Sequence, residues 1–215
     1  MIKTTWGYTL TEVDKLPNFL KPEEFAEFTN DKYSPSDTRI AANIPPATRS
    51  IQNYCGWHIF PNLECEMVYR VHDLRDSFIG PDLLIQLPAT LVTSVSQILL
   101  NAEKLNDTWA GDATTDFDLD ESGLLRIFDC GYLDRRSKIR IVYKAGIGEE
   151  QMDLIKELVA NSLIHAMANT YGIASENAGS VSVSYSASWA GNARSTALGS
   201  DTKDILAPYK VKGVF

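Results

Sequence analysis

The stretch "KIRIVYKAGIG", residues 138–148, alternates apolar and polar residues and then ends in two closely spaced glycines. Ile139, Ile141 and Tyr143 fall on one side of an extended chain, because successive side chains of a β-strand point to opposite faces. Gly146 and Gly148 then end the strand pattern. We therefore expect a half-buried strand that completes a sheet.

The preceding residues carry several further strand patterns. "DLLIQL", residues 82–87, is followed by Pro88 as a break and then by "VTSVSQILL", residues 92–100. Asn101-Ala102-Glu103 is predicted to form a turn, and "FDLDESGLLRIF", residues 117–128, a hairpin with Glu121-Ser122-Gly123 at its tip. Four or more antiparallel strands are expected.

Helical patterns flank this β-rich stretch. Residues 1 to about 60 favour helices, with Lys21-Pro22 opening a short one and Ser34 or Ser36 capping a longer one. Pro45-Pro46 interrupts the longer helix, which predicts a kink, or two helices of which the second starts at Pro46. Residues 149–172 show a further amphipathic helix pattern, which begins with acidic residues.

These patterns predict an α+β fold, with a small helical body, an inserted antiparallel β-sheet and an extended C-terminal arm. The expected divisions are residues 1–62 for the N-terminal segment and helices, 63–146 for the inserted β-rich subdomain, and 147–215 for the C-terminal helix and arm. Helices over residues 46–57 and 150–170 are expected to form the body.

The composition narrows the classes of function. The chain has 215 residues, a formal net charge of -8 and three cysteines without metal-site spacing, so we expect reduced thiols rather than a disulfide framework or a zinc site. The net charge argues against a surface built to neutralise nucleic acid, and the longest basic run, residues 134–138, is typical of a solvated loop. No apolar run is long enough for a membrane helix or a secretory signal, so we expect the protein to stay where it is made.

Neither a catalytic motif nor a cofactor motif stands out. The chain lacks the nucleophile-elbow, Walker A and zincin motifs, and no two of its three histidines have metal spacing. Asp116, Asp118 and Asp120 mimic the first half of a calcium loop, but the glycine and glutamate that such a loop requires are missing. We therefore expect no enzyme, cofactor or metal site, and interpret the aspartates as one solvated face of a strand.

The serine-rich stretch "SVSVSYSASWAG", residues 180–191, predicts a strand with little to bury. Val181, Val183, Tyr185 and Trp189 can share one face while serines occupy the other. Because a lone strand is marginal in water, we expect this stretch to dock on a neighbouring subunit or partner by strand addition. The alternatives are an intramolecular edge strand and a disordered tail.

Several segments resemble, in their order, the tailed-phage head-to-tail connector proteins, also called adaptor or head-completion proteins. They are "NYCGWHIFP", "LIQLPATLVTSVSQI", a tryptophan-containing turn and hairpin, "IRIVYKAG", an apolar helix, "GSVSVSYS" and "ILAPYK". The order covers residues 16 to 210. The resemblance implies an α-helical subunit with a β-insert, and a C-terminal segment that reaches a neighbour.

The resemblance also implies partners and a location. The subunit would form a ring of about a dozen copies, with each copy presenting two different complementary surfaces. It would contact the portal and the tail or stopper proteins, with DNA passing through without sequence-specific contact and no membrane involved. The expected location is the virion's head-to-tail junction, after synthesis in the bacterial host cytoplasm.

Within this interpretation, the predicted assembly arm consists of Val181, Val183, Tyr185, Trp189, Tyr209 and Lys210. Two alternatives stay open. One is another phage tail-completion protein, and the other is a calcium- or carbohydrate-binding β module based on the acidic cluster and the scattered tryptophans Trp6, Trp57, Trp109 and Trp189.

Overall fold

The computed structural model describes residues 1–120, 122–130, 133–168, 175–178, 181–184, 198 and 200–211. The chain forms two compact units. Unit 1 comprises Met1–Leu16, Gly56–Gly148 and Tyr209–Phe215, and unit 2 comprises Pro17–Cys55 and Glu149–Pro208. Each unit is therefore built from segments that lie far apart in the sequence.

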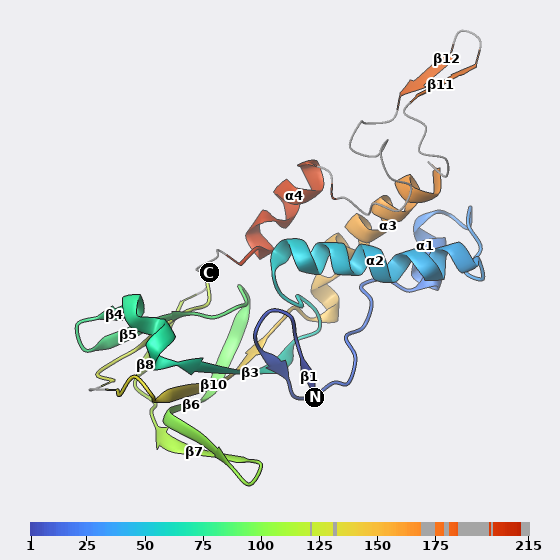
Figure 1. The fold of residues 1–215 in the computed structure, drawn as a ribbon. Helices are drawn as coiled ribbons and strands as arrows, with labels where there is room; N and C mark the ends of the chain where they lie inside the picture. The colour runs from blue at the N-terminus through green and yellow to red at the C-terminus, as the bar shows by residue number, and fades with distance from the viewer. Residues whose placement is uncertain are drawn as a thin grey trace. The chain divides into compact units, whose positions relative to one another are not determined.

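A six-stranded antiparallel sheet forms the larger part of unit 1 (Figure 1). Its order is β1-β2-β3-β10-β6-β7, so β10 lies inside the sheet between β3 and β6. The strands are β1 (Ile2–Lys3), β2 (Thr9–Leu10), β3 (Leu63–Arg70), β6 (Val92–Leu105), β7 (Thr108–Ala113) and β10 (Lys138–Ala145). The segment expected to complete the sheet, residues 138–145, is one of its inner strands.

A second, four-stranded antiparallel sheet completes unit 1. Its order is β4-β5-β9-β8, which makes β8 an edge strand. The strands are β4 (Phe78–Ile79), β5 (Asp82–Gln86), β8 (Phe117–Leu119) and β9 (Leu124–Ile127), and the 3-10 segment η1 (Val71–Ser77) precedes them.

Alternation along β10 explains how the larger sheet builds its core. Ile139, Ile141 and Tyr143 are completely buried, whereas Lys138 and Lys144 are exposed. This burial removes apolar surface from water, which is the main favourable term in folding. The half-buried strand expected over residues 138–143 is confirmed.

Unit 2 contains the helices and a separate two-stranded sheet. The helices are α1 (Pro22–Phe28), α2 (Thr38–Cys55), α3 (Asp153–Ala168) and α4 (Ser200–Leu206), with the 3-10 turns η2 (Glu149–Gln151) and η3 (Ala207–Tyr209). Helix α2 packs against α1, α3 and α4. Strands β11 (Ser175–Ala178) and β12 (Val181–Ser184) pair with each other in antiparallel register.

Helix α2 contains both prolines of the Pro45-Pro46 pair and remains one continuous helix. The prediction of two separate helices is therefore wrong. The missing proline N–H groups would have bonded the carbonyls of Ala41 and Ala42, which are exposed residues, so water can satisfy these oxygens instead.

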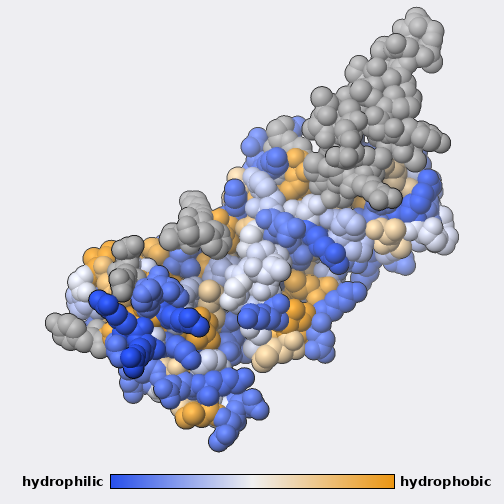
Figure 2. Space-filling view, in the orientation of Figure 1, coloured by the Kyte–Doolittle hydropathy of each residue, from blue (hydrophilic) through white to orange (hydrophobic). Residues whose placement is uncertain are grey.

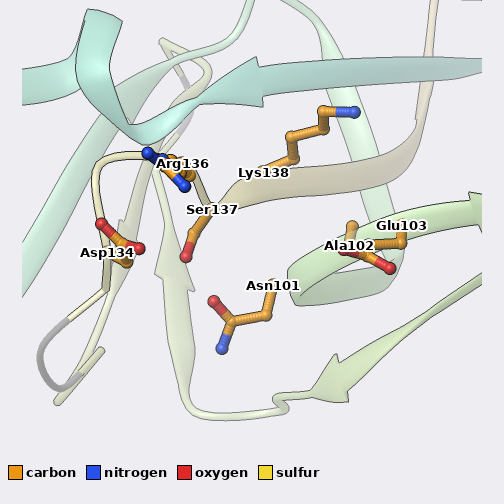
Figure 3. A pocket seen from close by; sticks show the side chains of 7 residues that line it. All are labelled: Asn101, Ala102, Glu103, Asp134, Arg136, Ser137 and Lys138. Atoms are coloured by element: carbon orange, nitrogen blue, oxygen red, sulfur yellow. The ribbon is translucent and has the colours of Figure 1, made fainter.

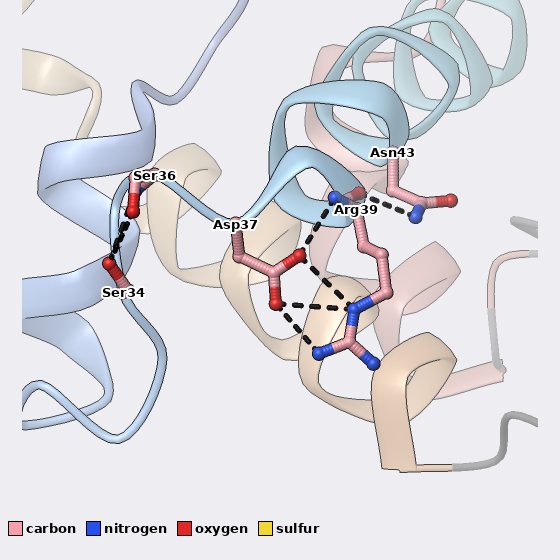
Figure 4. Close-up of polar contacts among 5 residues, drawn as sticks. All are labelled: Ser34, Ser36, Asp37, Arg39 and Asn43. Atoms are coloured by element: carbon pink, nitrogen blue, oxygen red, sulfur yellow. Dashed lines mark hydrogen bonds and ion pairs between the residues drawn. The ribbon is translucent and has the colours of Figure 1, made fainter.

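The cap of α2 also differs from the expectation. Asp37, rather than Ser34 or Ser36, precedes the helix, and its carboxylate accepts the backbone N–H of Arg39 at 2.9 Å (Figure 4). The Arg39 guanidinium bonds the same carboxylate at 2.7 Å, and these hydrogen bonds lower the pKa of Asp37. The two serine hydroxyls bond each other instead.

The predicted fold class, a small helical body with an inserted sheet, is wrong. Two antiparallel sheets make up most of the described chain, and the four helices are short. Helices over residues 46–57 and 150–170 do exist as parts of α2 and α3. However, the prediction missed the N-terminal strands β1 and β2. It also treated the larger sheet as an insertion, whereas unit 1, to which this sheet belongs, contains the three largest fully buried side chains, Trp57, Tyr8 and Tyr143.

The turn predicted at Asn101-Ala102-Glu103 is also wrong, since β6 continues through it to Leu105. Asn101 adopts a φ of 51°, and the pairing of β6 with β7 shifts register between Leu100 and Glu103. The turn residue therefore forms a β-bulge, and the hairpin turns at Asn106-Asp107, where both φ values are positive.

Candidate interaction surfaces

The predicted assembly arm is divided among several parts of the structure. Val181 and Val183 lie on β12, which pairs with β11, while Tyr185 and Trp189 lie outside the described residues. The register places Ala178 opposite Val181 and Ser175 opposite Ser184. Residues 181–184 thus have a strand partner within their own chain.

Tyr209 belongs to a different environment from β12. Its backbone carbonyl accepts hydrogen bonds from Nε1 of Trp57 at 2.6 Å and from Oγ1 of Thr90 at 3.4 Å. Trp57 is completely buried. Lys210, the last predicted arm residue, is exposed.

The three aspartates of the calcium-like segment lie on and around edge strand β8. Asp118 is on the strand, and Asp116 and Asp120 flank it; all three are exposed. The Asp120 carboxylate accepts the backbone N–H groups of Ser122 and Leu124. In the described part of the chain, no group of three or more His, Cys, Asp or Glu side chains could hold a metal ion.

The tryptophans occupy separate environments. Trp57 is buried, and Trp6 stacks on Tyr8 with ring centroids 6.1 Å apart. Trp109 donates its Nε1–H to Glu66 at 3.0 Å and lies under the Arg140 guanidinium. The structure thus gives these three rings intramolecular partners, and Trp189 lies outside the described residues.

A polar pocket of about 300 Å³ opens between β6 and the start of β10 (Figure 3). Figure 3 shows Asp134, Arg136 and Ser137 on the turn that precedes β10, with Ala102 and Glu103 on the β6 side. The full lining is Asn101, Ala102, Glu103, Asp134, Arg136, Ser137 and Lys138. Two cationic and two anionic side chains therefore line the same hollow.

Backbone hydrogen bonds fix the turn beside this pocket. The N–H of Ser137 donates to the carbonyl of Asp134 at 2.9 Å, and the N–H of Val71 donates to the carbonyl of Ser137 at 3.0 Å. Register then places Lys138 of β10 directly opposite Arg70 of β3. Two like charges face each other at this position, an arrangement that destabilises a sheet unless an anion neutralises it.

We call Arg70, Arg135, Arg136 and Lys138 the basic patch. All four are exposed, and among the described residues none has a side-chain ion-pair partner. Figure 2 shows strongly hydrophilic residues gathered on unit 1 near β8 and β10. The sequence alone indicates the basic run at residues 134–138 but not Arg70. Arg70 lies beside this run only because of the register between β3 and β10.

Helices of the described chain are too short or too polar to cross a membrane. Neither a protein-family profile nor a curated protein matches the chain.

Proposed function

We propose that the chain is a non-enzymatic structural subunit of a tailed-phage virion, which assembles as a ring beneath the portal and joins the DNA-filled head to the tail. The support from sequence is the order of segments from "NYCGWHIFP" to "ILAPYK". The helical subunit architecture is not part of this proposal, because two antiparallel sheets dominate the described chain.

The observation that carries the proposal is the hairpin β11–β12. Its two strands pair with each other and, among the described residues, with no other strand. An isolated two-stranded hairpin is marginally stable in water, and its outer edges leave backbone N–H and C=O groups unpaired. Addition of a strand from a neighbouring subunit or from the portal would satisfy them.

The first experiment measures assembly directly. Light scattering over a range of concentrations gives the mass of the purified protein, alone and with purified portal protein, and negative-stain images show the largest species. A closed ring supports the proposal. A protein that stays monomeric and does not bind portal contradicts it, and binding to an isolated tail instead would assign the chain to tail completion.

A matched pair of variants tests the hairpin edge. With two residues between Ala178 and Val181, the antiparallel pattern directs the N–H of Ser182 away from β11. Ser182→Pro therefore removes one outward N–H donor without removing a hydrogen bond within the hairpin. Ser182→Ala keeps this N–H donor. We expect assembly to weaken only with proline, and equal assembly of both variants would exclude this edge.

A further inference from the structure

We propose that the basic patch binds the acidic segment, Asp116–Asp120, of a second copy of this chain, as one interface of a head-to-tail assembly. This inference takes the ring geometry from the proposed function and depends on it to that extent. It assigns a binding partner to the pocket of Figure 3, to the basic patch, and to Asp116 and Asp118, which form no ion pair among the described residues.

The basic patch has no counter-ion among the residues that the structure describes. Lys138 and Arg70 face each other across β10 and β3, and Arg135 and Arg136 occupy the adjoining turn. Like charges in direct register raise the free energy of the sheet. Two carboxylates bound at this position would neutralise the cations, and the pair would then stabilise the sheet instead of destabilising it.

The acidic segment also has carboxylates without an ion-pair partner among the described residues, although Asp118 accepts the backbone N–H of Leu119 at 3.0 Å. Asp118 stands opposite Arg126 across β8 and β9, but the Arg126 guanidinium bonds Asp82 at 2.6 Å instead. In the described chain neither Asp116 nor Asp118 forms an ion pair. Two carboxylates thus remain available on an exposed strand edge.

The pocket carries charges of both signs. Glu103 and Asp134 line it beside Arg136 and Lys138, so a bare anion or a DNA phosphate would meet repulsion as well as attraction. An edge strand such as β8 presents carboxylates and backbone N–H groups together. Its carboxylates fit the two cations, and the outward N–H of Phe117 can donate to an acid, whereas that of Leu119 bonds Asp118.

Charge also favours this occupant over nucleic acid. The whole chain has 28 acidic and 20 Lys or Arg residues, and a net negative protein repels a polyanion at long range.

Because the basic patch and the acidic segment are different surfaces, the contact is heterologous. Repetition of a heterologous contact closes a ring or extends a filament.

The test uses reversed charges in the full-length protein. Variant one carries Arg135→Glu and Arg136→Glu, and variant two carries Asp116→Lys and Asp118→Lys. The control carries Lys3→Glu and Lys15→Glu, two exposed lysines elsewhere in unit 1. We expect each reversed variant to lose at least about tenfold in self-association, because like charges then meet at the interface. The control should associate as the wild type does.

Mixing gives the decisive result. In an alternating assembly of variants one and two, every interface again joins opposite charges, so association should return and should weaken with added salt. The proposal is overturned if a reversed variant associates like the wild type, or if two variants that unfold at the wild-type temperature stay apart when mixed. Duplex DNA binding that variant one loses without a change in self-association would also overturn it.

The same samples separate this interface from the proposed function. If the reversed variants still form rings on the portal, the connector function stands and the charge interface falls. If the wild type associates through the basic patch but does not bind portal, the interface stands and the connector function falls.

Discussion

The hydroxyl of Tyr8 donates a hydrogen bond to Nδ1 of His58 at 2.8 Å, and the backbone N–H of His58 donates to the same hydroxyl oxygen at 3.1 Å. The other ring nitrogen, Nε2, lies 3.1 Å from the carbonyl oxygen of Pro61 and 3.0 Å from that of Ala145. Carbonyls only accept, so Nε2 carries a hydrogen. Because burial lowers the pKa of His58 to about 4, the ring is neutral at pH 7 and Nδ1 accepts from Tyr8. His58 therefore links Tyr8, next to β2, to Ala145 at the end of β10.

His58 makes stability fall with acid. Burial lowers its pKa from 6.5 to about 4, so between these values the unfolded chain binds more protons than the folded chain. The stabilisation is complete above pH 6.5 and is lost as the pH falls to about 4, by up to about 3 kcal/mol. Urea unfolding at pH 7, 6 and 5 measures the loss.

Two variants show whether His58 causes this pH dependence. His58→Gln should flatten the dependence of the free energy of unfolding on pH between pH 6.5 and 5. His72→Gln, at an exposed position, should leave that dependence unchanged, and an equal slope in both variants would show that His58 is not its cause.

Gly146 should tolerate no side chain. It has a φ of 130°, and a Cβ there would lie 2.3 Å from the carbonyl oxygen of Pro61. Both the backbone conformation and the overlap oppose alanine, so Gly146→Ala should cost about 3 kcal/mol or more in free energy of unfolding. Chemical denaturation measures this cost. Gly80→Ala is the matched control, because its φ is 64° but no atom lies within 4 Å of a Cβ; we expect it to cost about 1 kcal/mol.

Trp57 should hold the C-terminal residues by its ring nitrogen. Trp57→Phe removes the donor to Tyr209 and leaves unfilled volume in the core, which should cost about 2 kcal/mol. Hydrogen exchange should then accelerate at residues 207–211. Trp6→Phe, at a partly exposed ring, should leave that exchange unchanged. Unaltered exchange in the Trp57 variant would show that other contacts hold this segment.

Local patterns predicted the central elements well, since they depend on near neighbours in the sequence. Strict alternation located β10, the apolar runs located β5 and much of β6, and helical periodicity located α3. Ser122-Gly123 lies in the turn between β8 and β9, as the hairpin prediction requires. Each of these signals comes from the period of side-chain burial.

Features that depend on distant partners escaped prediction. Strands β1 and β2 are two residues each, too short for a periodic pattern, and they form because β2 pairs with β3. The like-charge pair of Arg70 and Lys138 depends on register between strands 68 residues apart in sequence. The balance of sheet over helix also depends on such pairings, which explains the error in fold class.

The inner position of β10 has a consequence for synthesis on the ribosome. Its neighbours β3 and β6 emerge earlier and can pair with β2 and β7, yet the other edge of each must wait for residues 138–145. Pairings between strands far apart in sequence form slowly, and unpaired edges expose a nascent chain to association with others. The larger sheet can therefore close only after about two thirds of the polypeptide has been translated, and a holding chaperone should improve the yield of native protein.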